Sequence, residues 1–296
     1  MTHIKQLFVS DLQIPYQDDR AVALMLQVAK AWKPDAIDIL GDIDDQLEYS
    51  KYSDGTTDEA FNQLANNAKV NAKNDENYRK AVEKNKDVIL ENDAQIIRPE
   101  PLPIDPIPFV KHQAKAAADF YETIRKQHKK ADIFAALGNH DIRIFNYMDR
   151  KAPEFLEFIT PESMWGLDNL GIDWIWYEDQ PRLRYGGLHS HHGNTISSSG
   201  LAVAKDILNM DISLVRGHSH NAGLTYRTLP LSGRQLIGME IGHLCNENAY
   251  GLNYTWNPTW EKGFAINHIV DGTPFPTFIK ISPDYTCVVD GKIFLG

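Results

Sequence analysis

The chain has 296 residues, which is long enough for one large domain with insertions or for two small domains. Its 43% hydrophobic and 24% charged residues are typical of globular proteins, and its formal charge of −10 argues against a basic surface that grips duplex nucleic acid. No apolar run reaches transmembrane length, and the N-terminal apolar stretch is too short for a signal peptide. The composition therefore predicts a cytoplasmic protein without a membrane partner, in which Cys245 and Cys287 are reduced core residues.

The first forty residues have the pattern of one βαβ unit. Residues 4–10 and 36–40 are apolar runs of strand length. Between them, residues 19–32 have the apolar spacing of a helix, and the aspartates at positions 18 and 19 favour the positive end of its dipole. The order strand, helix, strand predicts a βαβ unit at the start of the chain.

From about residue 48 to residue 109 the chain departs from this pattern. Residues 48–91 are rich in Asn, Lys, Asp and Glu, and prolines recur between Pro99 and Pro108. The prolines predict an extended, non-helical return, because proline lacks the N–H that a helix interior requires. We interpret 48–109 as a polar helical and proline-rich insertion within a single domain of residues 1–296. It is either a lid or oligomer contact, or a solvated excursion without a chemical role.

Regular structure is predicted again after residue 109. Helices are expected at 110–130, at 143–158 with an interruption at Pro153, and at 201–208, and strands at 133–137, 173–177, 183–188 and 212–215. From residue 224 onward, short apolar runs separated by Gly and Pro predict a β-rich layer. This order predicts an α/β fold in which a central β-sandwich of mixed sheets is flanked by helices.

Three polar motifs each follow one of the predicted strands. They are Gly41-Asp-Ile-Asp-Asp45, Gly138-Asn-His-Asp141 and Gly217-His-Ser-His220. Because the carboxyl ends of neighbouring parallel strands meet at one edge of a sheet, these carboxylate, amide and imidazole groups are delivered toward one place. Such ligand types suit a pair of divalent cations, between which a shared carboxylate offsets the repulsion.

Taken in order along the chain, five blocks resemble the calcineurin-like metallophosphoesterases. The blocks are Asp11, Gly41-Asp42-x-x-Asp45, Gly138-Asn139-His140-Asp141, His192-Gly193 and Gly217-His218-x-His220. Three further stretches, at residues 10–16, 151–154 and 257–264, are similar to a phage and bacterial branch of these enzymes. The resemblance implies a metallophosphoesterase-type β-sandwich with two metal ions at the strand ends. It also implies a cytoplasmic location, in the host cytoplasm for a phage-encoded chain.

The resemblance further implies which residues bind the two divalent ions. The ligands are Asp11, Asp42 and His220 for the first ion, and Asp42, Asn139, His192 and His218 for the second. His192 is preferred to His191 because the family's ligand directly precedes a glycine. A mixed nitrogen and oxygen ligand set does not select one metal. Manganese is the first choice, with iron, zinc, nickel, cobalt and magnesium as alternatives.

One departure from the family pattern concerns the first metal ion. The first block is normally Asp-x-His, whereas this chain has Asp11-Leu12-Gln13. A neutral amide is a weaker ligand than imidazole for transition metals, so we expect the first ion to bind less tightly. Either Gln13 coordinates through its oxygen, or a water molecule takes its place, or the first site is empty at rest. In a simpler reading, Gln13 points aside and the site lacks one ligand.

The resemblance also assigns roles beside the metal ions. His140 would stabilise or protonate the leaving oxygen, and the Asp45 carboxylate would hold its imidazole in place. Asp141 is either a support for the ligands or a structural turn residue. Arg143 either binds a phosphate oxygen of the substrate or forms an ordinary surface salt bridge, and the sequence favours neither.

The implied function is hydrolysis of phosphate esters by a hydroxide bound to the dinuclear metal centre. A phosphodiesterase acting on nucleotide or nucleic-acid-type substrates is favoured, since the acidic net charge disfavours long duplex DNA but not small nucleotides or flexible ends. The alternatives are a phosphomonoesterase or protein phosphatase, and a non-catalytic binding module that retains the fold. Gln13 is the feature that supports this last alternative. The sequence leaves the oligomeric state open.

Overall fold

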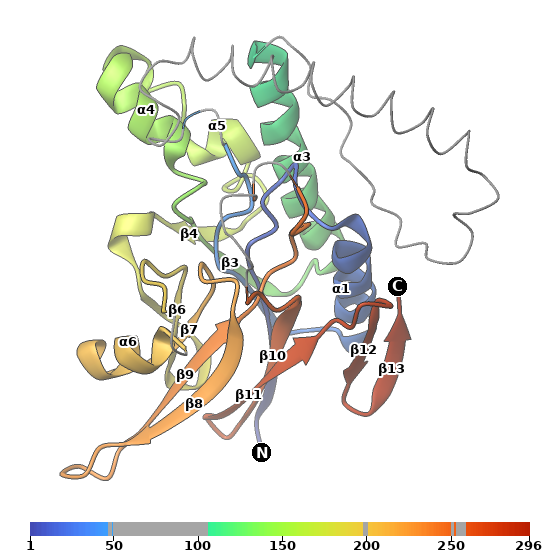
Figure 1. Ribbon diagram of the computed structural model, residues 1–296, viewed down its shortest axis with the longest axis vertical. Helices are drawn as coiled ribbons and strands as arrows, with labels where there is room; N and C mark the ends of the chain where they lie inside the picture. The colour runs from blue at the N-terminus through green and yellow to red at the C-terminus, as the bar shows by residue number, and fades with distance from the viewer. Residues whose placement is uncertain (47–48, 50–105, 198–200, 250–251, 253–258) are drawn as a thin grey trace.

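The computed structural model describes residues 1–46, 49, 106–197, 201–249, 252 and 259–296 (Figure 1). The predicted insertion at 48–109 thus lies outside the described residues, apart from Tyr49 and the backbone of the helix that begins at Pro106. Within the described part, two mixed β-sheets pack face to face and helices cover their outer faces.

The larger sheet has six strands in the order β11-β10-β1-β2-β3-β4. Strands β1 to β4 run parallel to one another, and β10 pairs antiparallel with both β1 and β11. The strands are β1 His3–Val9, β2 Ala36–Ile39, β3 Asp132–Ala136, β4 Asp173–Ile175, β10 Gly263–Val270 and β11 Thr273–Lys280. All four residues of β2 are buried, as is typical of a central parallel strand covered on both faces.

The second sheet has five strands in the order β5-β6-β7-β9-β8. Strands β6, β7 and β9 are parallel, and the edge strands β5 and β8 are antiparallel to their neighbours. A two-stranded hairpin, β12–β13, forms a sheet of its own at the end of the chain. The strands are β5 Arg182–Leu183, β6 Leu188–His191, β7 Ser213–Arg216, β8 Ala222–Thr228, β9 Gln235–Ile241, β12 Thr286–Val289 and β13 Lys292–Leu295.

Side-chain alternation along the strands produces the layers seen in Figure 1. The helices are α1 Asp19–Trp32, α3 Pro106–Gln127, α4 Arg143–Lys151, α5 Pro161–Trp165 and α6 Val203–Met210. On β1, Leu7 and Val9 pack into one core with α1 and α3, whereas Phe8 packs between the two sheets. Val203 and Ile207 of α6 cover the outer face of the second sheet. The predicted α/β sandwich of mixed sheets flanked by helices is confirmed.

A buried polar group joins the two sheets beside their apolar contact. The Arg184 guanidinium, which follows β5, lies 3.2 Å from the Asp38 carboxylate on β2 and 3.0 Å from the Asp132 carboxylate on β3. Asp38 also accepts hydrogen bonds from Gln6 and Ser190. Burial raises the pKa of Asp38 even though Arg184 acts in the opposite direction. This ion pair therefore matters mainly because its loss would leave a buried charge without a partner.

Local structure differs from the sequence prediction at two places. Pro106 and Pro108 are not extended but stand in the first turn of α3, where the missing N–H groups would have no partner within the helix. The single strand expected at 183–188 is divided into β5 and β6 by the 3-10 turn Tyr185–Gly187. Gly186 and Gly187 have φ of 65° and 74°, values that a strand does not accommodate.

The remaining local predictions agree with the structure more closely. Residues 19–32 form α1, and the Asp18 carboxylate caps it by accepting hydrogen bonds from Arg20 and Ala21 N–H. The predicted helix at 143–158 stops at Lys151, just before the interruption at Pro153. Both cysteines are buried free thiols. Among the described residues, no helix is long and apolar enough to cross a membrane.

Candidate metal site

The predicted site residues lie in loops that follow β1, β2, β3, β6 and β7, except Arg143, which is the first residue of α4. Parallel strands deliver these loops to a common edge of the sandwich, so residues far apart in sequence become neighbours. The contacts described below bring together Asp11, Gln13, Asp42, Asp45, Asn139, His140, Arg143, His192, His218 and His220. All ten residues singled out from the sequence therefore lie at this one place.

The backbone of this site is strained. Five of the seven predicted metal ligands have left-handed backbone angles, with φ between 52° and 70°: Asp11, Gln13, Asp42, His218 and His220. Residues other than glycine rarely adopt this region, and each instance costs on the order of 1 kcal/mol or more. Such strain persists where the surrounding structure holds the side chains in positions that function requires.

Two glycines allow the strand ends to approach closely. A Cβ atom added to Gly138 would lie 2.2 Å from Asp42 Oδ1, and one added to Gly217 would lie 2.0 Å from Ser10 Oγ. Any side chain at either position would push apart the loops that carry the predicted ligands. These two motifs therefore contain glycine because the close approach of the loops leaves no room for a side chain.

One half of the site is centred on Asp42. The ligand atoms of Asp42, His192 and His218 all lie within 4.8 Å of one another. His192 Nε2 lies 3.3 Å from Asp42 Oδ2 and 3.0 Å from Asn139 Oδ1. The four residues implied as ligands of the second ion therefore converge, and His192 rather than His191 takes part.

A backbone carbonyl fixes the orientation of the His192 ring. Its Nδ1 lies 2.6 Å from the Leu40 carbonyl oxygen, so Nδ1–H donates to that carbonyl and Nε2 faces Asp42. Burial lowers the pKa of His192, but the Asp42 carboxylate outweighs it and raises this pKa to about 9. Conversely, burial raises the pKa of Asp42, and the imidazoles of His140 and His192 hold it well below its usual range. Without a cation between them, the two groups therefore stabilise each other as a buried ion pair.

The other half of the site contains Asp11, His220 and Gln13. His220 Nε2 lies 3.2 Å from Asp11 Oδ1, and the Gln13 amide Nε2 donates to Asp42 Oδ2 over 3.1 Å. Gln13 therefore lies in the site and does not point aside. Its amide nitrogen faces the Asp42 carboxylate, and half a turn of the carboxamide would place Oε1 there instead.

The donor set fits divalent cations. Asp11 Oδ1 and Gln13 Oε1 are buried and have no hydrogen-bond partner among the described residues. Five buried aspartates crowd this edge of the sheet: Asp11, Asp42, Asp44, Asp45 and Asp141. Buried carboxylates require cations or hydrogen-bond donors to offset their loss of hydration. Carboxylate, amide and imidazole ligands together suit manganese, iron, cobalt, nickel or zinc.

His140 and Asp45 form a pair beside this donor set. The Asp45 carboxylate accepts from His140 Nδ1–H, and His140 Nε2 lies 3.8 Å from Asp42 Oδ2. Arg143 donates to His140 Nε2 over 2.8 Å and to the Asp45 carbonyl oxygen over 2.8 Å. Arg143 is thus not an ordinary surface residue, because its side chain lies within the group that contains the predicted general acid.

Asp141 has a structural role that the sequence left open. Its carboxylate accepts hydrogen bonds from the backbone N–H groups of Gly138, Asp42, Ile43 and Asp44, over 2.7 to 3.0 Å. It therefore ties the loop after β3 to the loop that carries Asp42. Burial, together with the neighbouring Asp42 carboxylate, raises the pKa of Asp141 to about 7.

Arg216 is a supporting residue that sequence reasoning missed. It is fully buried, and its guanidinium donates to Asp206 and to Thr195 Oγ1 over 2.7 Å. A Cβ atom on Gly193 would lie 2.4 Å from this guanidinium, so Arg216 packs directly against the loop after His192. Its place immediately before the Gly217-His218 motif is the only signal in the sequence, and it does not reveal the contact.

The fold and the site together define a class of protein: an α/β sandwich with carboxylate and imidazole groups at the strand ends that could hold metal ions. No family model matches the sequence. The Gene 54 proteins of Mycobacterium phages L5 and D29 are each 22% identical over 293 residues, covering 96% of this chain and 93% of each relative.

Three solved structures resemble the structure of this chain in part. Vacuolar Protein Sorting 29 from Cryptosporidium parvum is 12% identical with a TM-score of 0.43, over 99% of this chain and 95% of that one. YfcE, a phosphoesterase from E. coli, is 13% identical with a TM-score of 0.37, over 97% of both chains. TT1561 of Thermus thermophilus is 11% identical with a TM-score of 0.33, over 94% and 99% of the two chains.

Proposed function

We propose that this protein is a metal-dependent phosphoesterase whose preferred substrates are phosphodiesters of the nucleotide or nucleic-acid type. One observation carries the proposal: the imidazole of His140 lies next to the bridging carboxylate, with Nε2 3.8 Å from Asp42 Oδ2. A proton-transfer group therefore stands beside a cation-binding centre, which is the combination that hydrolysis of a stable ester requires.

The proposal divides the donor groups between two divalent ions. Asp42 would be shared, with Asp11, His220 and the Gln13 amide on one side and Asn139, His192 and His218 on the other. Bound divalent ions would act as Lewis acids toward a phosphoryl oxygen and would lower the pKa of water. The neutral amides of Asn139 and Gln13 add ligand oxygens without adding negative charge near an anionic substrate.

His140 would deliver a proton to the leaving oxygen from Nε2. Its Nδ1–H is donated to the Asp45 carboxylate, which keeps the ring turned toward Asp42. In the structure, Nε2 accepts a hydrogen bond from Arg143. Since a protonated Nε2 and a guanidinium are both donors, Arg143 must leave Nε2 before His140 acts as an acid.

Arg143 would move from His140 to a non-bridging oxygen of the substrate. The charge-assisted bond to a phosphate is stronger than a bond to a neutral imidazole, so substrate binding itself would draw the guanidinium away. Release of Nε2 would then accompany binding of the ester. This couples the proton donor to the presence of substrate, through residues that already touch each other.

The substrate class follows from charge. A formal charge of −10 disfavours long duplex DNA, which binds to basic surfaces. Small nucleotides and flexible nucleic-acid ends need only the local positive charge that bound metal ions provide. A phosphomonoesterase or protein phosphatase is the alternative within the same chemistry.

The test is hydrolysis of bis-p-nitrophenyl phosphate beside p-nitrophenyl phosphate, with Mn²⁺ titrated into metal-stripped protein. We expect Mn²⁺-dependent cleavage with a preference for the diester. Cleavage of the monoester alone would identify a phosphatase. Folded protein that turns over neither ester with any divalent ion would instead support a non-catalytic binding module, the reading that Gln13 favours.

A further inference from the structure

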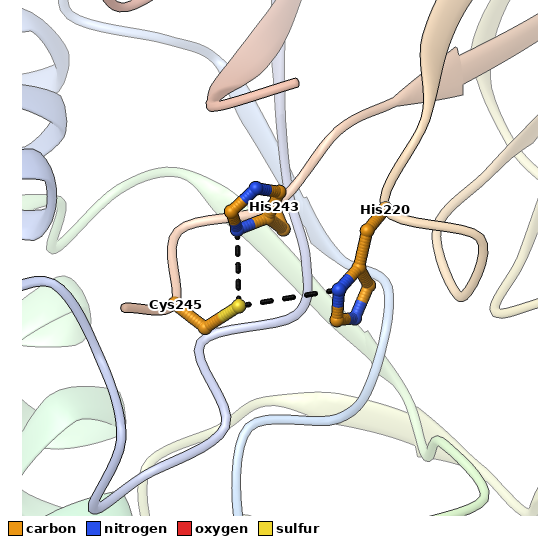
Figure 2. A group of neighbouring side chains, drawn as sticks. All are labelled: His220, His243 and Cys245. Carbon is orange, nitrogen blue, oxygen red and sulfur yellow. Dashed lines mark hydrogen bonds between the residues drawn. The ribbon is translucent and has the colours of Figure 1, made fainter. Parts of the chain in front are cut away.

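A second cluster of ligand-type side chains lies directly behind His220 (Figure 2). His220 follows β7, whereas His243 and Cys245 follow β9, and all three residues are buried. The segment after β9 is held in extended pairing, since Leu244 N–H donates to the Asp11 carbonyl and Leu244 O accepts from Asp18 N–H. His243 and Cys245, two residues apart, therefore point to the same side, toward His220.

The three ligand atoms of this cluster surround a common space. Cys245 Sγ lies 3.0 Å from His243 Nδ1 and 4.0 Å from His220 Nδ1, and all three atoms lie within 4.8 Å of one another. A tetrahedral zinc ion with bonds of about 2.3 Å to sulfur and about 2.0 Å to nitrogen separates those two atoms by about 3.5 Å. The two observed distances bracket this value.

Both imidazole rings have a carboxylate at their far nitrogen. His243 Nε2 lies 3.2 Å from Glu247 Oε1, and His220 Nε2 lies 3.2 Å from Asp11 Oδ1. A carboxylate that lies close to the outer nitrogen of a histidine favours the tautomer in which that nitrogen carries the hydrogen and the inner nitrogen carries a lone pair. Here the inner nitrogen is Nδ1 in both rings, and it faces the thiol in both.

We propose that His220, His243 and Cys245 form a binding site for one thiophilic divalent cation of the zinc class. The site is distinct from the Asp42-centred donors and uses the opposite nitrogen of His220. Two imidazoles and one thiolate are ligands that zinc prefers, and three protein ligands are the number found in zinc sites that keep one position for water or another small ligand.

The two sites share His220, and this has a consequence for the first metal of the proposed phosphoesterase. A neutral imidazole offers one lone pair, so an ion on Nδ1 takes the lone pair that an ion on Nε2 would need. Zinc at the cluster therefore competes with the first ion beside Asp11. Binding at the cluster does not require hydrolysis, so the proposal stands independently of the phosphoesterase function.

The test is a titration of Co²⁺ into the metal-stripped full chain, followed by absorption. We expect a thiolate-to-cobalt charge-transfer band in the near ultraviolet, with the intensity of one cobalt–thiolate bond per chain at saturation. Cys245→Ser should abolish the band, and His243→Gln should weaken it. Cys287→Ser is the matched control, because Cys287 is the other buried free thiol and lies outside the cluster. That variant should retain the full band.

Two further measurements separate this proposal from the phosphoesterase and from a folding defect. Asp42→Asn removes the shared carboxylate of the proposed phosphoesterase site, and the thiolate band should persist in it. Zinc-edge X-ray absorption of the unmodified protein should show a sulfur neighbour at about 2.3 Å, and this needs no variant. Only nitrogen and oxygen neighbours, or a cobalt band that survives in folded Cys245→Ser, would overturn the proposal.

Discussion

At the scale of single residues, the contacts of His140 show which hydrogen bond must break before the proposed proton transfer. Its two ring nitrogens have different partners, the Asp45 carboxylate at Nδ1 and the Arg143 guanidinium at Nε2. The first partner orients the ring, and the second occupies Nε2, the nitrogen from which a proton would be delivered. Substrate must therefore compete for Arg143 before proton transfer can occur.

We expect His140→Ala to lower kcat by about 100- to 10,000-fold, the usual contribution of a general acid. Metal content should be unchanged, because no predicted metal ligand depends on its imidazole for its position, whereas thermal stability should fall, because the buried Asp45 carboxylate loses its partner. Diester hydrolysis together with metal analysis checks this result. His112→Ala, at an exposed histidine on α3, serves as the control and should keep full activity. Full activity in His140→Ala would remove His140 from the mechanism.

We expect Gln13 to limit the affinity of the proposed first metal site, because an amide is a weaker ligand than an imidazole. Because its carboxamide already lies against Asp42, an imidazole introduced by Gln13→His should reach the first ion and raise its affinity on the order of tenfold. Equilibrium dialysis against Mn²⁺ measures the change. Gln13→Ala should lower the affinity for the first ion. An equal metal content in all three proteins would show that position 13 is not a ligand position.

At the scale of elements, the two sheets are joined by Arg184 as well as by apolar packing. Arg184→Met would leave the fully buried Asp38 without its cation, and we expect a loss of about 3–5 kcal/mol in the free energy of unfolding. Urea denaturation checks the loss. Arg182→Met is the matched control: Arg182 pairs with Asp173 at the surface, and its loss should change stability by less than about 0.5 kcal/mol. Equal effects of the two variants would contradict a special role for Arg184.

At the scale of the whole molecule, the aspartates are distributed unevenly. Asp11, Asp42 and Asp45 are fully buried at one edge of the sandwich, within a chain of formal charge −10. Bound cations would reduce the repulsion among these carboxylates. They would bind the folded state only, since the ligands come from five separate strand ends.

Removal of divalent ions should therefore destabilise the protein. Chelation should lower Tm, and Mn²⁺ at about 100 times its Kd should restore about 2.7 kcal/mol, or roughly 5 °C in a chain of this size. Differential scanning calorimetry with and without Mn²⁺ measures the shift. In Asp42→Asn the shift should be lost. A Tm independent of divalent ions in the unmodified protein would contradict cation binding at this edge.

The amino-acid sequence by itself determined the local elements and the order of the motifs. Helix α1 occupies residues 19–32 as predicted, because its apolar period and its Asp18 cap are local signals. The motifs after β1, β2, β3 and β7 could be placed at one edge because strand ends and the ligand chemistry of Asp, Asn and His are readable residue by residue. The distant groups that a carboxylate or guanidinium side chain contacts could not be predicted in the same way.

Only the tertiary structure decided which distant groups touch. The Asp141 carboxylate accepts hydrogen bonds from backbone N–H groups nearly a hundred residues away, and Arg216 packs against the loop after His192. Cys245, after β9, lies beside the ring of His220, which follows β7. Strand pairing sets these contacts: β10 joins β1 from the far end of the chain, and β9 places the segment after it beside the loop after β1. Such pairing depends on the packing of whole sheets, so no local pattern in the sequence records it.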